Sequence, residues 1–442
     1  MTNKETITKL ATLIDKKGGK TYYVGGYVRD LFLGRESKDI DIEVHGIDEE
    51  TLKDILRKVG KPLEYGKAFG IYSLAGTNID IALPRSEVKT GEGHRDFEIK
   101  VDPNISLEDA TRRRDFTINS MMIDVLTDEL IDPFNGKEDL ENRILRHVAD
   151  KTFVEDPLRI FRAAQFASRF NFKIDESTIE LCKTMDETKL SKERVEEELK
   201  KALLGSNKPS LFFDNLIKMD KLGYWFAELK MAVGYEQNPN KHPEGDLYKH
   251  TMLALDEGAI YKEYVSDPYS FMLLILVHDL GKLNTKVMTE EGIHFYGHEN
   301  YLDNAKSLLD RIISNNEIKA YIYEMIPKHM RGHKIFNYKL NEYESNIWFD
   351  GVKHPKDLVY FAVCDKSNHR DPNRLLYLLN RYNIYENIIN RYQIKGEDLI
   401  AKDIKPNDKF SEYLAYGKDL LYQGLSKEDA LNKTVEYIKS NS

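Results

Sequence analysis

Hydrophobic positions recur with two different periods along this chain. Over residues 1 to about 20, Ile7, Leu10 and Ile14 lie three and four apart, which predicts an amphipathic helix. The same spacing predicts a helix over Glu49–Val59. Short alternating segments predict strands at 21–24, around 39–42, at 70–75 and at 78–83. From about residue 150 the pattern is nearly all helical, so we expect an α+β fold: a head with a small mixed β-sheet and helices, then an all-helical body.

A glycine turn and two acidic strand positions follow each other near the N-terminus. Gly25 and Gly26 come after the first strand and let the backbone approach a ligand closely. In the next strand Asp39 and Asp41 share one face, where two carboxylates repel each other unless a cation lies between them. Either pattern alone is more typical of a tight hairpin with a solvated acidic strand. Together they indicate nucleotide chemistry, with a divalent cation on the carboxylates and Arg29 as a bidentate phosphate donor.

The run Gly-Gly-x-Val-Arg-Asp-x-x-Leu-Gly followed by Asp-x-Asp resembles the signature of the nucleotidyltransferase superfamily. More narrowly, it is similar to class II tRNA nucleotidyltransferases (CCA-adding enzymes) and to bacterial poly(A) polymerases. The resemblance implies that Asp39 and Asp41 bind two Mg²⁺ ions. One ion lowers the pKa of the tRNA 3′-hydroxyl, and the other neutralises the triphosphate and the leaving pyrophosphate. The resemblance also implies that Asp80, between two isoleucines, is a third catalytic carboxylate; an edge-strand charge is the alternative.

Two further segments of the head extend this resemblance. Residues 85–103 are polar and are interpreted as a mobile loop that positions primer and nucleotide, or as a disordered connection. A capping box at Ser106 opens a helix whose Asp115 and Asn119, four residues apart, share a face suited to a triphosphate and ribose hydroxyls. This helix closely resembles the family's Arg-Arg-Asp-x-x-x-Asn motif. The phosphate-holding residues implied are Gly25, Gly26, Arg29 and Arg114.

Another specific motif is Glu-Asp-x-x-Arg at the start of a later helix. Asp156 and Arg159 lie one turn apart and offer an acceptor and a fork of donors that suit the polar edge of cytosine or adenine. In the family that it resembles, this motif is the amino-acid template that selects CTP and ATP, with Arg162 nearby for phosphate or packing. The family often has a further arginine where Gln165 stands, which leaves that contact open. Residues 193–199 resemble the motif that braces the template helix, or form an exposed helix with ion pairs.

The second half of the chain carries histidines and aspartates that resemble an HD-domain metallohydrolase. The matching positions are His250, His278, Asp279 and Asp365, with His278 and Asp279 at the end of a strongly apolar run. Imidazole and carboxylate ligands suit a transition-metal divalent cation that activates water for phosphoester hydrolysis. Candidates for a second metal or for a general acid are His298, His329 and His333. Alternatively, the domain persists only as structure.

Composition narrows the class of protein. The chain has 442 residues, a formal charge of −9 and a pI near 5.8, so we expect two to four domains and only local contacts with nucleic acid. The two cysteines, Cys182 and Cys364, provide neither a disulfide framework nor a thiolate zinc site. The N-terminus lacks an apolar signal region, and the longest apolar run, 271–277, is too short to span a bilayer. These features predict a cytoplasmic protein with no membrane partner.

The expected domains are a nucleotidyltransferase head at 1–148, a helical neck and body with the nucleotide-selecting and tRNA-binding motifs at 149–235, an HD domain at 236–385 and a helical tail at 386–442. The expected partners are the tRNA acceptor arm, CTP and ATP, and the oligomeric state is left open. Glu43 shares the face of Asp39 and Asp41, where it either perturbs metal binding or points to solvent.

Four functions are consistent with these motifs, and template-independent CCA addition ranks first. A poly(A) polymerase, or an enzyme that adds only CC or only A, ranks second, because bacterial poly(A) polymerases tend to carry a basic C-terminal extension that this acidic chain lacks. An HD phosphohydrolase acting on cyclic phosphates or nucleotides comes third, and the two activities are compatible. A non-enzymatic RNA-binding role is last, because it requires neither set of carboxylates.

Overall fold

The computed structural model describes residues 2–37, 39–65, 70–89, 97–366, 371–391 and 393–441. Side chains are described in these ranges except at 65, 85–89, 97–100 and 391. The chain packs as two compact units: Met1–Leu190 with Leu211–Lys221, and Ser191–Ser210 with Leu222–Ser442. The four-part division expected from the sequence is finer than this one and stays a prediction. Among the described residues, no helix combines the length and apolar composition that crossing a membrane requires.

A seven-stranded mixed sheet forms the centre of the first unit, in the order β3-β4-β5-β2-β1-β8-β9. β2 and β5 are parallel, and the other neighbouring pairs are antiparallel. The pairing of β2 with β5 places Asp41 directly opposite Asp80. The strands are β1 (Lys20–Val24), β2 (Ile40–His45), β3 (Pro62–Tyr65), β4 (Ile71–Leu74), β5 (Ile79–Ala82), β8 (Met122–Asp124) and β9 (Leu130–Ile131).

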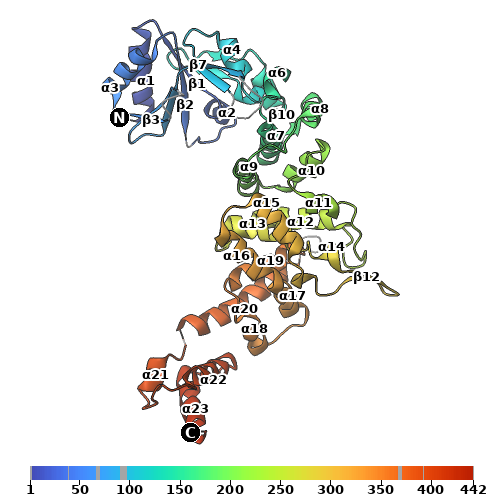
Figure 1. The fold of residues 1–442 in the computed structure, drawn as a ribbon. Helices are drawn as coiled ribbons and strands as arrows, with labels where there is room; N and C mark the ends of the chain where they lie inside the picture. The colour runs from blue at the N-terminus through green and yellow to red at the C-terminus, as the bar shows by residue number, and fades with distance from the viewer. Residues whose placement is uncertain are drawn as a thin grey trace. The chain divides into compact units, whose positions relative to one another are not determined.

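Two amphipathic helices, α1 (Asn3–Asp15) and α3 (Glu49–Val59), cover one face of this sheet (Figure 1). The apolar residues predicted to line α1 are buried, and they pack with isoleucines of β2 and β5. α1 begins with a capping box in which the Thr2 hydroxyl accepts from the Glu5 amide and the Glu5 carboxylate accepts from the Thr2 amide. Burial of this face leaves the acidic positions of β2 and β5 on the other side, away from the core.

Two expectations for the head are corrected. The flanks of the predicted loop form a ladder of β6 (Arg85–Lys89) and β7 (Phe97–Val101), whereas the loop's centre, 90–96, lies outside the described residues. The helix opened by Ser106 does not reach Asn119, because α4 (Leu107–Arg112) ends early and Asn119 lies in a 3₁₀ turn, η1 (Thr117–Asn119). Between them the extended Phe116 forms a β-bridge with His147, and this distant pairing replaces the helix.

The rest of the first unit is mainly helical. One parallel pair of very short strands, β10 with β11, interrupts the helical pattern expected there. The elements are α2 (Gly26–Phe32), α5 (Gly136–Glu141), β10 (Ile144–Leu145), α6 (Asp150–Phe153), α7 (Leu158–Phe170), β11 (Lys173–Ile174), α8 (Glu176–Thr184) and α10 (Ser210–Lys218), the last of which begins in the second unit.

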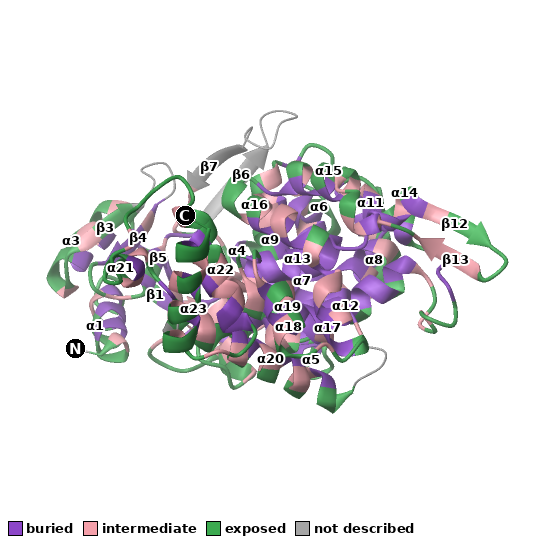
Figure 2. Cartoon of the chain, turned by 90° about the horizontal axis from the view of Figure 1, so that it is seen from below, coloured by how far each residue is buried: buried purple, intermediate pink, exposed green. Residues whose placement is uncertain are grey.

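The second unit is helical apart from one hairpin, β12 with β13, among the residues described. Its centre is α13, whose residues from Tyr269 to Val277 are all buried (purple in Figure 2). The unit contains α9 (Lys192–Gly205), α11 (Ala227–Ala232), α12 (Leu247–Tyr261), η2 (Lys262–Tyr264), α13 (Pro268–Val277), α14 (Lys282–Thr285), β12 (Lys286–Thr289), β13 (Gly292–Phe295), η3 (His298–Asn300), α15 (Asp303–Ile312), α16 (Asn316–Met325), η4 (Ile326–Lys328), α17 (Met330–Asn337), α18 (Glu342–Phe349), α19 (Pro355–Cys364), α20 (Pro372–Arg391), α21 (Gly396–Ile400), α22 (Phe410–Tyr422) and α23 (Lys427–Ser440). The predicted mixed-sheet head followed by a helical body is therefore confirmed.

Candidate active site and metal centre

Three carboxylates lie together on the polar side of the head sheet. Asp39 precedes β2, Asp41 lies within it, and Asp80 is the partner of Asp41 on β5. Burial raises the pKa of Asp41, and the neighbouring Asp80 and Asp39 raise it further against the effect of Arg114. Partial burial and Asp39 likewise raise the pKa of Asp80. Crowded acids of this kind are stabilised by a cation between them, so the donor set fits a hard divalent ion.

The glycine turn brings the backbone against the same carboxylates. Gly25 has a φ of +66°, a conformation that side chains disfavour. A Cβ atom there would lie 3.0 Å from Nη1 of Arg114 and 3.6 Å from Oδ2 of Asp41. The missing side chain therefore lets Arg114, which the sequence predicts to hold phosphate, lie directly against the turn beside Asp41.

Arg29 is the residue whose surroundings differ most from the expectation of an open phosphate donor. It is 5% exposed, and its Nη1 donates to Oδ1 of Asn119 at 2.7 Å. Its Nε and Nη2 donate to Asp30, and its guanidinium lies over the rings of Phe166 and Phe170. These contacts join α2 to α7, so the observed role of Arg29 is to hold the glycine turn against the helix that carries the template motif.

Asp115 and Asn119 do meet, although no continuous helix carries them. Nδ2 of Asn119 donates to Oδ1 of Asp115 at 3.0 Å, and Nε of Arg162 donates to Oδ2 of Asp115 at 2.7 Å. Burial alone would raise the pKa of Asp115, but Arg162 and Asn119 hold it below its ordinary value. A connected polar network thus runs from Arg29 through Asn119 and Asp115 to Arg162 on α7.

The template motif lies at the beginning of α7. Asp156 accepts from the amide of Leu158 at 3.1 Å. Arg159 donates from Nη1 to the carbonyl of Thr152 at 2.6 Å and from Nη2 to the carbonyl of Arg113 at 2.8 Å. Because Arg113 precedes Arg114, this second bond ties the template helix directly to the segment beside the carboxylates.

Gln165, the position where the sequence departs from the family pattern, lies inside the protein. Its side chain is 1% exposed, and its Nε2 has no hydrogen-bond partner among the described residues. Gln165 is therefore buried within α7 and does not lie on its exposed face.

Glu43 does not point to solvent, although it follows Asp41 on the same face of β2. It is 4% exposed, and its Oε1 lies 2.8 Å from Nε2 of the buried His45. Its Oε2 pairs with Nη2 of Arg114 at 3.4 Å. Burial opposes ionisation, but the hydrogen bond from His45 and the charge of Arg114 lower the pKa of Glu43. Glu43 therefore holds Arg114 near Asp41, a role that the sequence left undecided.

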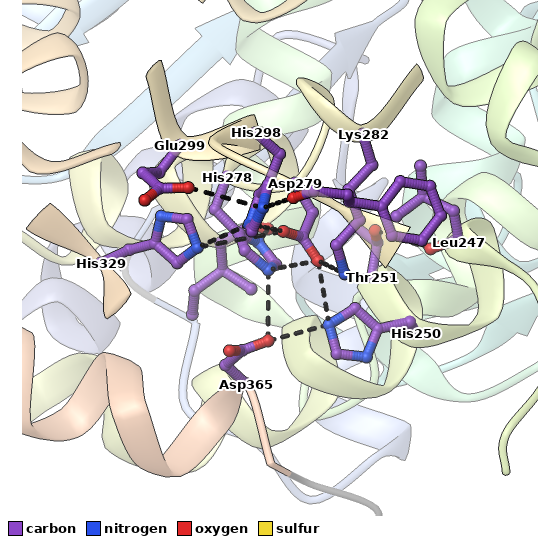
Figure 3. A network of polar contacts seen from close by, with 12 residues as sticks. Leu247, His250, Thr251, His278, Asp279, Lys282, His298, Glu299, His329 and Asp365 are labelled. Atoms are coloured by element: carbon purple, nitrogen blue, oxygen red, sulfur yellow. Dashed lines mark hydrogen bonds and ion pairs between the residues drawn. The ribbon is translucent and has the colours of Figure 1, made fainter. Parts of the chain in front are cut away.

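The second unit contains a separate polar centre built from distant segments (Figure 3). His250 comes from α12, His278 and Asp279 follow α13, and Asp365 follows α19. Nε2 of His250 lies 2.8 Å from Oδ1 of Asp365, and Nε2 of His278 lies 3.2 Å from oxygens of both aspartates. All four side chains are buried, and their ligand atoms lie within 4.8 Å of one another.

Hydrogen bonds fix the tautomers of three histidines in this centre. Nδ1 of His278, of His298 and of His329 faces the carbonyl three residues earlier, at 2.8, 2.9 and 2.6 Å. A carbonyl only accepts, so each Nδ1 carries a hydrogen, and in the neutral ring each Nε2 presents a lone pair to the centre. Nε2 of His278 is buried and makes no hydrogen bond. Nε2 of His298 and of His329 face Oδ1 of Asp279, at 3.1 and 3.9 Å.

His333 has the opposite arrangement. Nη1 of Arg374, which can only donate, lies 3.2 Å from Nδ1 of His333, so the hydrogen of the neutral ring is on Nε2. That nitrogen forms a 2.6 Å ion pair with Oδ2 of Asp365. This geometry favours a role in holding Asp365 over metal ligation by His333, the role proposed from sequence.

Two buried carboxylates govern protonation in this centre. Burial opposes the charged imidazole, yet Asp279 and Asp365 raise the pKa of His250 to about 10 and that of His278 to about 9. Protons on these rings compensate the carboxylates, and a divalent cation compensates them equally while releasing those protons. The mixture of imidazole and carboxylate donors therefore fits a transition metal.

Comparison with known proteins identifies the family. Residues 21–146 match the family model described as the Poly A polymerase head domain. The multifunctional CCA protein of Haemophilus ducreyi is 34% identical over 323 residues, which cover 71% of this chain and 76% of that protein. The chain belongs to the multifunctional CCA protein family. The relative from Nitrosococcus oceani is 39% identical over 283 residues, covering 63% of this chain and 66% of that protein.

Solved structures support the same fold. The CCA-adding enzyme of Thermotoga maritima, solved in complex with tRNA, aligns with a TM-score of 0.66 and 23% identity over 97% of this chain and 94% of that chain. A CCA-adding enzyme solved with ATP aligns with a TM-score of 0.68 and 23% identity over 98% of this chain and 94% of that chain. The architecture of a CCA-adding enzyme thus extends beyond the matched head.

The family implies a divalent metal for nucleotidyl transfer, and the three carboxylates of the head fit it. Two residues near these sites were not predicted from the sequence: His45, which supports Glu43, and Glu244, which contacts His250. His45 continues the alternation of Asp39, Asp41 and Glu43, so the signal was present. Glu244 lies in a loop before α12, where no periodicity points to it.

Proposed function

We propose that this protein adds CCA to the 3′ end of tRNA from CTP and ATP, without a nucleic-acid template. The observation that carries the proposal is the bond from Arg159 to the carbonyl of Arg113. It joins the helix suited to base recognition to the segment whose Arg114 lies beside the carboxylates. This bond supports the proposal that base selection and phosphate binding share one framework.

In this proposal the phosphates of the incoming nucleotide lie against the glycine turn at Gly25 and the adjoining guanidinium of Arg114. Asp39, Asp41 and Asp80 hold Mg²⁺, which when bound activates the tRNA 3′-hydroxyl and neutralises the triphosphate and pyrophosphate. Glu43 keeps the guanidinium of Arg114 in place. The hydrogen-bond network described above maintains the distance between the glycine turn and α7, through Arg29, Asn119 and Asp115.

Base selection is assigned to Asp156 and Arg159. The two carbonyls that Arg159 contacts fix the plane of its guanidinium, which has five N–H donors, so donors remain for the edge of a base. The carboxylate of Asp156 accepts from an exocyclic amino group, which cytosine and adenine both carry and uracil lacks. Arg162, held by Asp115, supports the same helix face.

The test uses tRNA transcripts that end before CCA, after C and after CC, each with Mg²⁺ and labelled CTP, ATP or both. The proposal expects growth that stops after CCA and is lost in the Asp39→Ala/Asp41→Ala variant. An unlimited A tail, or addition of only C or only A, would reassign the product. Absence of incorporation in every reaction would overturn the proposal. A cytoplasmic location accompanies a tRNA substrate and stays a prediction.

A second activity is proposed for the histidine centre: hydrolysis of phosphoesters, with cyclic phosphates or nucleotides as substrates. The supporting observation is that three Nε2 lone pairs, fixed by backbone carbonyls, converge with two carboxylates. A transition metal held by His250, His278, Asp279 and Asp365 would supply an activated water, and His298 and His329 with Asp279 offer donors for a second ion.

Hydrolysis of a 2′,3′-cyclic nucleotide and of an RNA end with a cyclic phosphate, in the presence of Ni²⁺, Co²⁺ or Mn²⁺, tests this assignment. Asp279→Asn is expected to abolish hydrolysis, and Asp39→Ala/Asp41→Ala is expected to leave it unchanged. Hydrolysis that survives Asp279→Asn would overturn the assignment.

A further inference from the structure

The fourth histidine of the metal centre, His250, is oriented differently from the other three. His278, His298 and His329 each direct Nδ1 at a backbone carbonyl. Nδ1 of His250 instead lies 2.8 Å from Oε1 of Glu244, a side-chain carboxylate that carries a full negative charge. Among these four rings, the orientation of His250 alone depends on a replaceable side chain.

We propose that Glu244 is a positioning residue that prepares His250 for the metal, and that His242 keeps Glu244 in place. The proposal rests on the metal centre proposed for the second unit. Its first support is the carboxylate itself: Oε1 of Glu244 accepts from Nδ1 of both His250 and His242, at 2.8 and 2.9 Å. An ionised carboxylate has no hydrogen to donate, so both Nδ1 atoms carry theirs.

That hydrogen determines the other side of the His250 ring. With Nδ1 protonated and bound, Nε2 faces Oδ1 of Asp365 at 2.8 Å and Oδ2 of Asp279 at 3.4 Å. Nε2 is therefore directed at the carboxylates that would share the ion. The ring of His242 meets that of His250 edge to face, with 4.8 Å between centroids, so the two rings enclose Glu244 from different directions.

The loop that carries Glu244 is fixed at both ends. The amide of His242 donates to the carbonyl of Asn238 at 2.8 Å. Gly245 has a φ of +114°, which side chains disfavour, and Asp246 caps α12 by accepting from the amide of Lys249 at 2.8 Å. The Glu244 side chain is only 3% exposed. A buried charge on so constrained a loop is expensive unless it is paired, and its pairing here is with histidines.

The charge of Glu244 has a consequence that a carbonyl would not have. A carboxylate hydrogen-bonded to the far nitrogen of a metal-bound imidazole makes the ring a stronger ligand and compensates the charge of the ion. The other three rings receive orientation from neutral carbonyls and little compensation. We therefore expect metal affinity in this centre to depend on the charge of Glu244.

The experiment measures binding of Co²⁺ alone to the metal-free full-length protein, by calorimetry and by the visible absorption of the bound ion. Glu244→Gln keeps the shape and an acceptor but removes the charge, and we expect a roughly 10-fold weaker Kd. Glu244→Ala also removes the acceptor, and we expect a loss approaching 100-fold with an altered absorption spectrum. Thermal unfolding without metal should show that Glu244→Gln stays folded.

Glu299→Gln is the matched control. Oε2 of Glu299 lies 3.6 Å from Nδ1 of His298, whose hydrogen already goes to the carbonyl of Phe295 at 2.9 Å. The Kd of the Glu299→Gln variant for Co²⁺ should equal that of the wild type. A folded Glu244→Gln protein with unchanged Kd and unchanged absorption would overturn the role of Glu244. Failure of the wild type to bind Co²⁺ is a different result, because it would remove the metal centre itself.

Discussion

The two polar centres of this protein compensate buried charge in opposite ways. In the head, buried acids are paired with arginines of the chain, as Asp115 is with Arg162 and Glu43 with Arg114. The exposed acids near Asp41 are the ones left for a ligand. In the second unit the acids Asp279 and Asp365 are buried, and most of their partners are histidines, which can exchange a proton for a metal. Lys282, whose Nζ lies 2.6 Å from Oδ2 of Asp279, is a fixed cation beside them. In the head only the acids around Asp41 are left for a cation, whereas in the second unit the buried acids themselves are the candidates for binding one.

The largest expected effects come from disabling each centre in turn and measuring the functions of both. Asp41→Asn removes one charge from the head carboxylates and should lower nucleotide addition by at least about 10³-fold, the scale of losing a key electrostatic group. It should leave Co²⁺ binding in the second unit unchanged. Asp279→Asn should abolish Co²⁺ binding and leave the rate of addition within about twofold of the wild type, because the head pairs its own buried charges. Radiolabelled addition assays and calorimetry on both variants test the separation, and loss of both functions in either variant would contradict it.

The pairing of buried acids with arginines in the head also predicts that the stability of the protein depends on pH. The pKa of Asp115 lies below its ordinary value in the folded protein. The unfolded chain therefore binds the proton more tightly. The contribution of the Asp115 carboxylate to stability is thus fully present above about pH 4 and disappears as the pH falls through the folded-state pKa. Asp115→Asn should lower the free energy of unfolding by about 2 kcal/mol at pH 7, less than the roughly 3–5 kcal/mol of a fully buried pair, because Arg162 is 31% exposed.

Urea unfolding followed by circular dichroism at several pH values measures this contribution. The difference between wild type and Asp115→Asn should shrink as the pH falls below about 4, where the wild type loses its advantage. Asp109→Asn is a suitable control, since Asp109 is 60% exposed and should show little difference at any pH. A difference that grows as the pH falls would contradict the lowered pKa of Asp115.

The contrast between the two polar centres also explains which features the sequence could predict. Alternation placed Asp39 and Asp41 on one face, because the period of a strand determines side-chain direction locally. Asp80 was a candidate only through the family resemblance, and the pairing of β2 with β5 brings it opposite Asp41. Alternation could not show that Glu43 is buried, since burial depends on Arg114, which lies far along the chain. The helix expected through Asn119 failed for a similar reason, because Phe116 pairs with His147.

In the second unit, motif spacing identified the metal-binding candidates but not their tautomers. The four positions of the HD resemblance come together as expected. Which ring nitrogen is available, however, is decided by the carbonyl of Ile275, by Arg374 and by Glu244, and none of these follows from the spacing of histidines. His333 was grouped with the ligand candidates because sequence carries no signal of its contact with Arg374.

A smaller effect is expected from the residue that ties base selection to the head. Arg159→Lys keeps the charge but cannot span the carbonyls of Thr152 and Arg113, because lysine lacks the planar fork. Discrimination between CTP and UTP should fall by about 10- to 100-fold, the value of one bidentate contact. The ratio of kcat/KM for the two nucleotides on a transcript lacking CCA measures it. An unchanged ratio would show that Arg159 only braces the helix.

The smallest expected effect distinguishes an acid whose charge is balanced by an arginine of the chain from an acid whose charge is balanced by a bound metal ion. Glu43→Gln removes the charge that holds Arg114 while leaving the exposed carboxylates intact. The guanidinium then loses its fixed position, and the triphosphate must order it on binding. We therefore expect KM for CTP and ATP to rise about 10-fold, or about 1.4 kcal/mol, with kcat nearly unchanged. Glu50→Gln, which makes the same charge change at a position 81% exposed, should leave KM unaltered. Were Glu43 part of the metal-binding set, kcat would fall instead and extra Mg²⁺ would restore it, so the split between KM and kcat decides which centre this acid belongs to.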